Sequence, residues 1–141
     1  MDPVSAAASI TGIVGFAGTA GSLIHTYISS VKHASVDAQA LEAEVTVLKF
    51  TLGKFGSFLH NQRWPNRELD ESTVLFQTLN GCTDQILSLL HKLRKLHKKH
   101  GISRIFQTLK WPLEKEDTMK EIETLHRYTQ TFHFLLSIEG L

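Results

Sequence analysis

The sequence predicts an all-α protein, folded as an antiparallel four-helix bundle with one additional short helix. Apolar residues recur at helical spacing in four long segments, and no segment carries the alternation of a half-buried strand. The three prolines, Pro3, Pro65 and Pro112, lie near the starts of these segments or between them. Because the segments match in length and most connections are short, antiparallel packing is the most economical arrangement.

Length and composition fit one globular domain, which we take as residues 1–141. Apolar residues make up 42% of the chain and charged residues 21%, so disorder is not indicated. The formal net charge of +1 excludes no class of partner. Cys82 is the single cysteine, so an internal disulfide is impossible, and we expect a reducing, intracellular compartment.

The first expected helix runs from Pro3 to about Lys32, with Asp2 as its N-cap. Between Pro3 and Val31 it contains no Asp, Glu, Lys or Arg. We expect it to be anchored in the resting bundle by Ile10, Val14, Ala17, Ile24 and Ile28. The expected anchoring residues in a membrane or in an oligomer are Ile10, Ile13, Val14, Phe16, Ala17, Leu23, Ile24 and Ile28.

Three interpretations of this uncharged segment compete. A secretory signal peptide is disfavoured because Asp2 stands where a basic region belongs. A membrane span is allowed by the length of about 20 residues. The ordinary interpretation is a helix that packs within the bundle. Glycines at positions 12, 15, 18 and 21 each lower helix propensity by up to about 1 kcal/mol, so the helix depends on packing or on lipid.

The second expected helix, Val36 to Leu59, follows a cap at Ser35 and carries a heptad seam of Leu41, Val45, Leu48, Leu52, Phe55 and Leu59. The third, Glu68 to Lys99, carries a similar seam of Leu75, Leu79, Cys82, Ile86, Leu89, Leu93 and Leu96. Its place on the seam makes Cys82 a small buried hydrophobe. Ile102 to Leu109 is the additional short helix.

A basic run extends from Lys92 to Lys110 and contains seven Lys or Arg residues and no acid. The predicted basic surface consists of Lys92, Arg94, Lys95, Lys98, Lys99 and Arg104. It is either a solvated helix end, favoured by the negative end of the helix dipole, or a surface for anionic lipid headgroups. Nucleic acid is not expected as a partner, because no recognition motif accompanies the cations.

The last expected helix runs from Lys115 to Ser137, after a boundary at Trp111, Pro112 and Leu113. Its first turns are acidic, which suits the positive end of the helix dipole. Its apolar positions are Met119, Ile122, Leu125, Thr129, Phe132 and Leu136.

No arrangement of residues predicts catalysis, a cofactor or a metal ion. His97 and His100 are three residues apart, but the neighbouring Arg94 and Lys95 disfavour a divalent cation. No catalytic triad has a recognisable sequence context, and no glycine-rich loop follows a strand. We therefore expect a protein that is not an enzyme.

Two stretches of sequence carry a family resemblance. The opening residues 1–13, MDPVSAAASITGI, lead through the first helix to Val-Lys-His-Ala at residues 31–34. Residues 109–116 read Leu-Lys-Trp-Pro-Leu-Glu-Lys-Glu, with Leu113 where the related pattern has an aromatic residue. Over essentially its whole length the chain resembles the HeLo-like N-terminal domain of fungal NOD-like receptors, the STAND proteins.

The resemblance implies an effector domain of programmed cell death, heterokaryon incompatibility and non-self recognition. It implies a cytoplasmic domain that forms homo-oligomers on activation, relocates to the plasma membrane, and targets or permeabilises it through the first helix, residues 3–31. In this family the domain usually precedes a NACHT or NB-ARC module, so the chain is expected to be the N-terminal part of a larger receptor; the alternative is a small stand-alone relative. The alternative is an adaptor that binds other helical signalling domains without acting on membranes.

Overall fold

Four long α-helices make up the computed structural model, which describes residues 3–31, 33–61, 74–98 and 111–138. The helices are α1 (Pro3–Ser30), α2 (Val36–Asn61), α3 (Val74–Lys98) and α4 (Lys115–Ile138), and none of the described residues is in a strand. The predicted all-α fold and four-helix bundle are therefore confirmed. The expected short helix at 102–109 and the expected first turns of the third helix at 68–73 lie outside the described residues.

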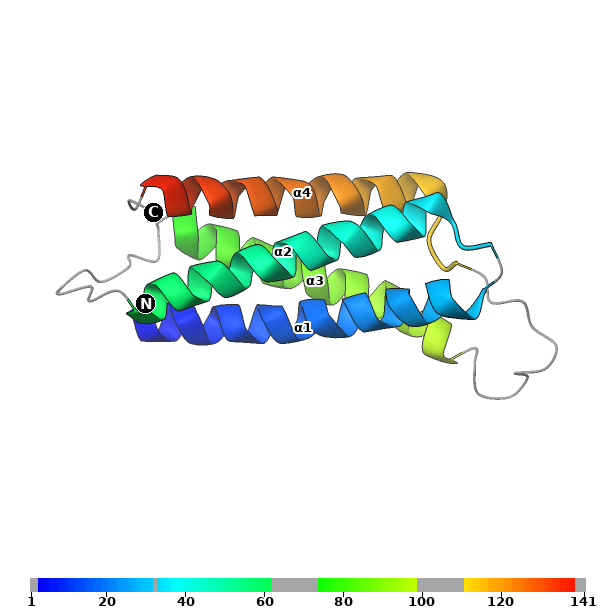
Figure 1. Ribbon diagram of the computed structural model, residues 1–141, viewed down its shortest axis with the longest axis horizontal. Coiled ribbons are helices and arrows are strands. Elements are labelled where there is room, and N and C mark those ends of the chain that lie inside the picture. Colours follow the sequence, from blue (N-terminus) through cyan, green and yellow to red (C-terminus); the bar gives the residue numbers. More distant parts are fainter. Residues whose placement is uncertain (1–2, 32, 62–73, 99–110, 139–141) are drawn as a thin grey trace.

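Successive helices run in opposite directions, as Figure 1 shows. Around the bundle, α1 lies beside α2 and α3, and α4 also lies beside α2 and α3. The diagonal pairs are therefore α1 with α4, and α2 with α3. Adjacent helices include two parallel pairs, α1 with α3 and α2 with α4, as well as the antiparallel pairs.

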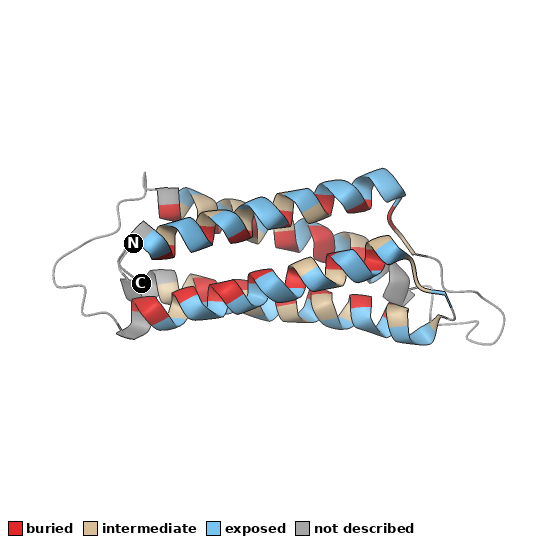
Figure 2. Cartoon of the chain, turned by 45° about the horizontal axis from the view of Figure 1, so that its top comes forward, coloured by how far each residue is buried: buried red, intermediate tan, exposed pale blue. Residues whose placement is uncertain are grey.

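The bundle interior is formed by the predicted heptad seams. Every member of the α2 seam is buried, and so is every member of the α3 seam whose side chain is described, from Leu75 to Leu93. Figure 2 shows the buried residues turned inward on all four helices. Phe55 on α2 packs edge-on against Phe132 on α4, with ring centroids 5.8 Å apart. Cys82 is fully buried, as its seam position predicted.

Two helix starts have the local hydrogen bonds that their sequences favour. The amide of Asp37 donates to Ser35 Oγ at 3.1 Å, which confirms Ser35 as the cap of α2. At the start of α4, the amide of Thr118 donates to the carbonyl of Glu114 at 2.9 Å. Glu116 and Asp117 lie in the first turn of α4, at the positive end of the helix dipole.

The inward face of α4 differs from the predicted one at its first position. Met119 is 43% exposed, whereas Thr118 and Glu121 are buried. The inward face is centred on Thr118, Leu125 and Phe132, which recur every seven residues. Met119 is one residue from Thr118, so it points about 100° away from the core. The prediction that Met119 faces the core is therefore wrong, and Thr118 and Glu121 are buried on this part of α4 instead.

Candidate functional site: helix α1 and the surfaces that hold it

The predicted anchoring residues of α1 divide between the core and its edge. Ile10, Ile13, Ala17 and Ile24 are buried, Val14, Leu23 and Ile28 are half-buried, and Phe16 is 39% exposed. In the resting bundle these residues therefore do not form one lipid-facing surface. The four buried side chains would become accessible only if α1 left its neighbours.

The outward face of α1 carries no charged side chain. Apart from Phe16 and His25, its exposed residues are small or hydroxylated: Ala8, Thr11, Gly12, Gly15, Thr19, Ser22, Thr26, Ser29 and Ser30. The hydroxyls of Thr11, Thr19 and Ser30 donate to carbonyl oxygens four residues earlier, at 3.0, 3.1 and 2.6 Å. Because these hydroxyls are satisfied within the helix, moving this face out of water costs less than its composition suggests.

Helix α1 is also long and apolar enough to cross a membrane. The stretch that meets this criterion is Ala7–Ser30, 24 residues, with 28% of its most apolar window buried inside the bundle. A buried helix of a soluble protein meets the same criterion by length and composition. What distinguishes α1 is that its exposed face is also free of charge.

Small residues let α1 and α2 approach each other closely. A Cβ atom added at Gly56 would be 3.2 Å from Ile10 Cγ2, and one added at Gly21 would be 3.7 Å from Val45 Cγ1. At these two positions the helices are therefore in van der Waals contact through small and branched side chains.

Two charged side chains of α2 lie against α1 among the described residues: Glu42, beside His25, and Lys49, whose Nζ would be 3.5 Å from a Cβ added at Gly18. His25 Nδ1 lies 3.3 Å from Glu42 Oε2, and the His25 side chain is 71% exposed. The geometry is not that of a hydrogen bond, since Glu42 Oε2 is buried and has no hydrogen-bond partner. This contact therefore contributes little to holding α1, and burial of apolar side chains contributes most.

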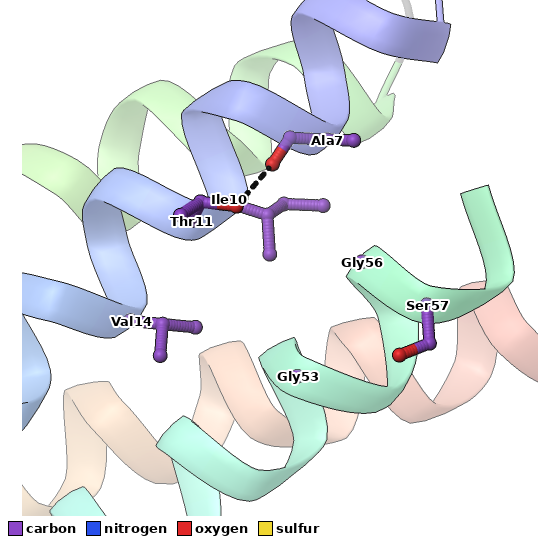
Figure 3. Close-up of a pocket in the computed structure, with 7 residues that line it drawn as sticks. All are labelled: Ala7, Ile10, Thr11, Val14, Gly53, Gly56 and Ser57. Carbon is purple, nitrogen blue, oxygen red and sulfur yellow. Dashed lines mark hydrogen bonds between the residues drawn. The ribbon is translucent and has the colours of Figure 1, made fainter. Parts of the chain in front are cut away.

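A groove of about 360 Å³ opens between the N-terminal half of α1 and the C-terminal half of α2. Figure 3 shows Ile10 directed at the α2 backbone near Gly56, with Val14 farther along α1. The groove is lined by Ala7, Ile10, Thr11, Val14, Gly53, Gly56 and Ser57. It has no charged side chain in its lining, so it suits an apolar occupant.

The element at Trp111, Pro112 and Leu113 fastens the other end of α1. The Trp111 ring lies 5.0 Å from the Tyr27 ring of α1, centroid to centroid. Its Nε1 donates to Thr118 Oγ1 on α4 at 3.0 Å, and Leu113 is buried. Sequence analysis identified this element as a boundary and missed its contact with Tyr27, because nothing in the spacing connects positions so far apart.

The predicted basic surface is only partly within the described residues. Lys92 Nζ lies 2.9 Å from Glu121 Oε1 on α4, so Lys92 pairs with a carboxylate that is itself 3% exposed. Arg94 is exposed. Lys95 and Lys98 lie on α3 without described side chains, and Lys99 and Arg104 lie outside the described residues. A surface for anionic lipids at this end of α3 stays a prediction.

Glu121 is a buried carboxylate that sequence analysis did not single out. Its Oε2 accepts a hydrogen bond from Gln85 Nε2 at 2.6 Å, while its Oε1 pairs with Lys92. Gln85 and Lys92 are seven residues apart, so both face α4 from α3. The seven-residue spacing of Gln85 and Lys92 was the only hint of this site in the sequence. Glu121 itself did not stand out from the other acids in the first turns of the last helix.

Burial shifts the pKa of two further titratable groups, Cys82 and Tyr128. Burial raises the pKa of the Cys82 thiol from 9.0 to about 12, which suppresses the nucleophilic thiolate. Burial, and then the charges of Cys82 and Asp84, raise the pKa of Tyr128. Among the described residues, no three His, Cys, Asp or Glu side chains are grouped so that they could hold a metal ion.

Comparisons of the chain with protein-family models, with curated proteins and with solved structures find no match. The functional proposal therefore depends on the geometry of α1 and its neighbours, together with the patterns in the sequence.

Proposed function

We propose that this chain is a non-enzymatic effector domain of the HeLo-like kind that its sequence resembles, and that it acts on membranes through α1 after self-association. The observation that supports this most is the absence of charge from both faces of α1. A charged side chain at the centre of a membrane-spanning helix costs about 3 kcal/mol or more, and α1 has none.

The burial of α1 decides how it is released. Ile10, Ile13, Ile24 and Tyr27 are all at most 7% exposed. Exposing one such side chain to water costs roughly 1.5–3 kcal/mol, so exposing all of them approaches the whole stability of a domain, about 5–15 kcal/mol. Helix α1 therefore does not detach into water. It leaves only when another apolar environment, lipid or a neighbouring copy, receives it in the same step.

In the proposed mechanism, clustering of the chain at a membrane provides the apolar environment that receives α1. A receptor that assembles through other modules brings copies of residues 1–141 to a high local concentration at the plasma membrane. Exposed cations such as Arg94 then attract anionic headgroups, each worth about 1 kcal/mol near the surface. Programmed cell death and non-self recognition are the cellular roles that the resemblance implies for such a domain.

A vesicle leakage assay tests this proposal. The chain is fused to a module that clusters on addition of a small ligand, and release of dye from vesicles rich in phosphatidylserine is followed. Thr19→Lys places a charge on the exposed face of α1, where the folded bundle tolerates it and a bilayer does not. Thr131→Lys is the matched control, because Thr131 on α4 makes the same hydrogen bond to the carbonyl four residues earlier.

We expect clustered wild-type chain and Thr131→Lys to release dye, and Thr19→Lys to release it at least about tenfold more slowly. Equal leakage from the two variants would contradict a role for α1 in the membrane. Absence of leakage and binding from the clustered wild-type chain would overturn the membrane part altogether.

The groove between α1 and α2 favours the second candidate, an adaptor that binds another helical domain. An uncharged groove beside Gly53 and Gly56 suits a single apolar side chain of a partner helix. Gly53→Met places a long apolar side chain beside this groove, and its Cβ has space because a Cβ at Gly53 meets nothing within 4 Å. An adaptor loses its signalling in cells with Gly53→Met and keeps it with Thr19→Lys, whereas a membrane effector shows the reverse.

Charged substitutions on the inward face of α1 do not separate the two candidates. Ile13 and Ile24 are at most 1% exposed, so Ile13→Glu with Ile24→Glu places two carboxylates in the core. Either kind of protein then loses its fold. Substitutions on the exposed face of α1 are therefore the informative ones.

A further inference from the structure

The outward face of α2 carries a second heptad seam that no described helix covers. Residues 36, 40, 43, 47 and 50 are spaced by 4, 3, 4 and 3, and all five side chains are exposed: Val36, Ala40, Ala43, Val47 and Phe50. The three larger ones are 79%, 47% and 66% exposed. We call these five residues the outer seam of α2. Figure 1 shows α2 crossing the bundle in front of α3.

Two facts set the outer seam apart from ordinary surface apolar residues. Single apolar residues on a surface are common and need no explanation, but five at heptad spacing over about two heptads form one stripe that suits packing against another helix. The inner seam of the same helix, from Leu41 to Leu59, is fully used inside the bundle. Helix α2 thus carries two seams, of which the bundle occupies one.

The distribution of charge along α2 indicates which occupant fits. Asp37, Glu42 and Glu44 lie in its first half, and Lys49 and Lys54 lie in its second half. A second α2 placed antiparallel brings each acidic half beside a basic half, whereas a parallel one brings like charges together. The charges therefore favour a second copy of this chain, related by a twofold axis.

The sizes of the seam residues agree with the same arrangement. In an antiparallel pair centred between Ala43 and Val47, each residue faces the one at equal distance on the other side of the centre. Phe50 of one copy then faces Ala40 of the other, and Val47 faces Ala43. Each large side chain meets a small one, as interdigitated packing requires. At the ends of the seam Val36 faces Lys54, whose Nζ lies 4.8 Å from the Phe50 ring centroid in its own copy.

We infer that the outer seam of α2 is a self-association surface that forms an antiparallel, twofold-symmetric dimer. One pair of helices over residues 36–50, a rise of about 21 Å, buries less than the roughly 1,200 Å² of a stable complex. The dimer is therefore weak in dilute solution and forms when copies are concentrated. This inference gives a surface to the self-association in the proposed function, and it places that surface on α2, away from the membrane-active helix.

Sedimentation velocity over a wide concentration range tests the surface. Phe50→Glu is compared with Phe134→Glu, because Phe134 on α4 is 63% exposed and is not on the outer seam. We expect a concentration-dependent dimer of the wild-type chain that Phe134→Glu retains and that Phe50→Glu weakens at least about tenfold. Circular dichroism checks that both variants stay folded. A monomer at every concentration, or a dimer that Phe50→Glu leaves intact, would overturn the inference.

Disulfide capture tests the direction of the pair. Copies with Val36→Cys are mixed with copies with Lys54→Cys, both carrying Cys82→Ala. The antiparallel dimer yields the mixed disulfide, and like-with-like disulfides would mean a parallel pair and contradict the inference. Neither experiment contains lipid. The absence of a dimer would therefore contradict only this inference, whereas the leakage assay with Thr19→Lys tests the proposed membrane function.

Discussion

The seam between α1 and α2 and the seam between α3 and α4 are built by opposite means. The first joins small and branched apolar residues, such as Gly56 and Ile10, with one histidine–glutamate contact at its edge. The second encloses Glu121 between Lys92 and Gln85, and it fits Tyr128 against Gly81, where an added Cβ would be 2.5 Å from the phenol oxygen. A seam of the first kind can separate into an apolar medium, whereas the second would expose a charge to it.

The largest expected effect comes from removing a buried side chain from the seam between α1 and α2. Ile24→Ala removes a fully buried side chain, so the free energy of unfolding should fall by about 2–5 kcal/mol. Urea unfolding measures this loss, and Ile28→Ala is the control, because Ile28 is only half-buried. An equal loss at the two positions would mean that α1 is not held mainly by its buried face.

The next effect concerns the ion pair in the seam between α3 and α4, where removing either partner should cost a different amount of stability. Lys92→Met leaves the buried Glu121 without its cation, which should lower the free energy of unfolding by about 2–3 kcal/mol. Glu121→Gln should lower it by less, because Lys92 is 40% exposed and turns to solvent. Urea unfolding of both variants checks the order. The reverse order would show that the carboxylate is not the enclosed partner.

Alkaline pH should weaken the core through Cys82. Because burial raises the pKa of this thiol from 9.0 to about 12, the unfolded chain loses its proton between these values while the folded chain keeps it. Stability is fully present below about pH 9 and falls above it by at most about 1.4 kcal/mol per pH unit for this group. Unfolding measured at several alkaline pH values should show a shallower fall for Cys82→Ala. An unchanged slope would mean that deprotonation of the Cys82 thiol is not what weakens the core.

The smallest expected effect tests how closely α1 approaches α2. Gly53→Ala meets nothing within 4 Å, so it should stabilise α2 by about 0.5–1 kcal/mol through helix propensity alone. Gly56→Ala should gain less or lose stability, because its Cβ would be 3.2 Å from Ile10 Cγ2. Thermal unfolding of the two variants measures the difference. Equal gains would mean that the seam is looser than the structure has it.

The heptad spacing was enough to predict the buried faces of α2 and α3, because apolar residues at these positions have no other place in a bundle. It was not enough for α4, where a buried carboxylate interrupts the apolar pattern and Met119 lies outside it. The spacing of apolar residues shows which face of a helix is buried, but not which other helix packs against it. The order of helices around the bundle therefore could not be predicted.

The candidate site was predicted in part. The absence of charge from α1 is a property of the sequence and was visible at once. The pairing of Tyr27 with Trp111 and the groove beside Gly53 arise between residues far apart in the chain, so they required the structure. The free outer seam of α2 also required it, because only burial distinguishes a seam that is occupied from one that is not.

Locking α1 to α2 tests the central claim most directly. A Cβ at Gly56 would be 3.9 Å from Ile10 Cβ, within the range for a disulfide, so Ile10→Cys with Gly56→Cys, in a Cys82→Ala background, should form one. The same clustered protein is then assayed for leakage from anionic vesicles, oxidised and reduced. The account predicts no leakage while the disulfide holds α1 in place, and leakage after its reduction. Leakage at the same rate from the oxidised and reduced protein would contradict it.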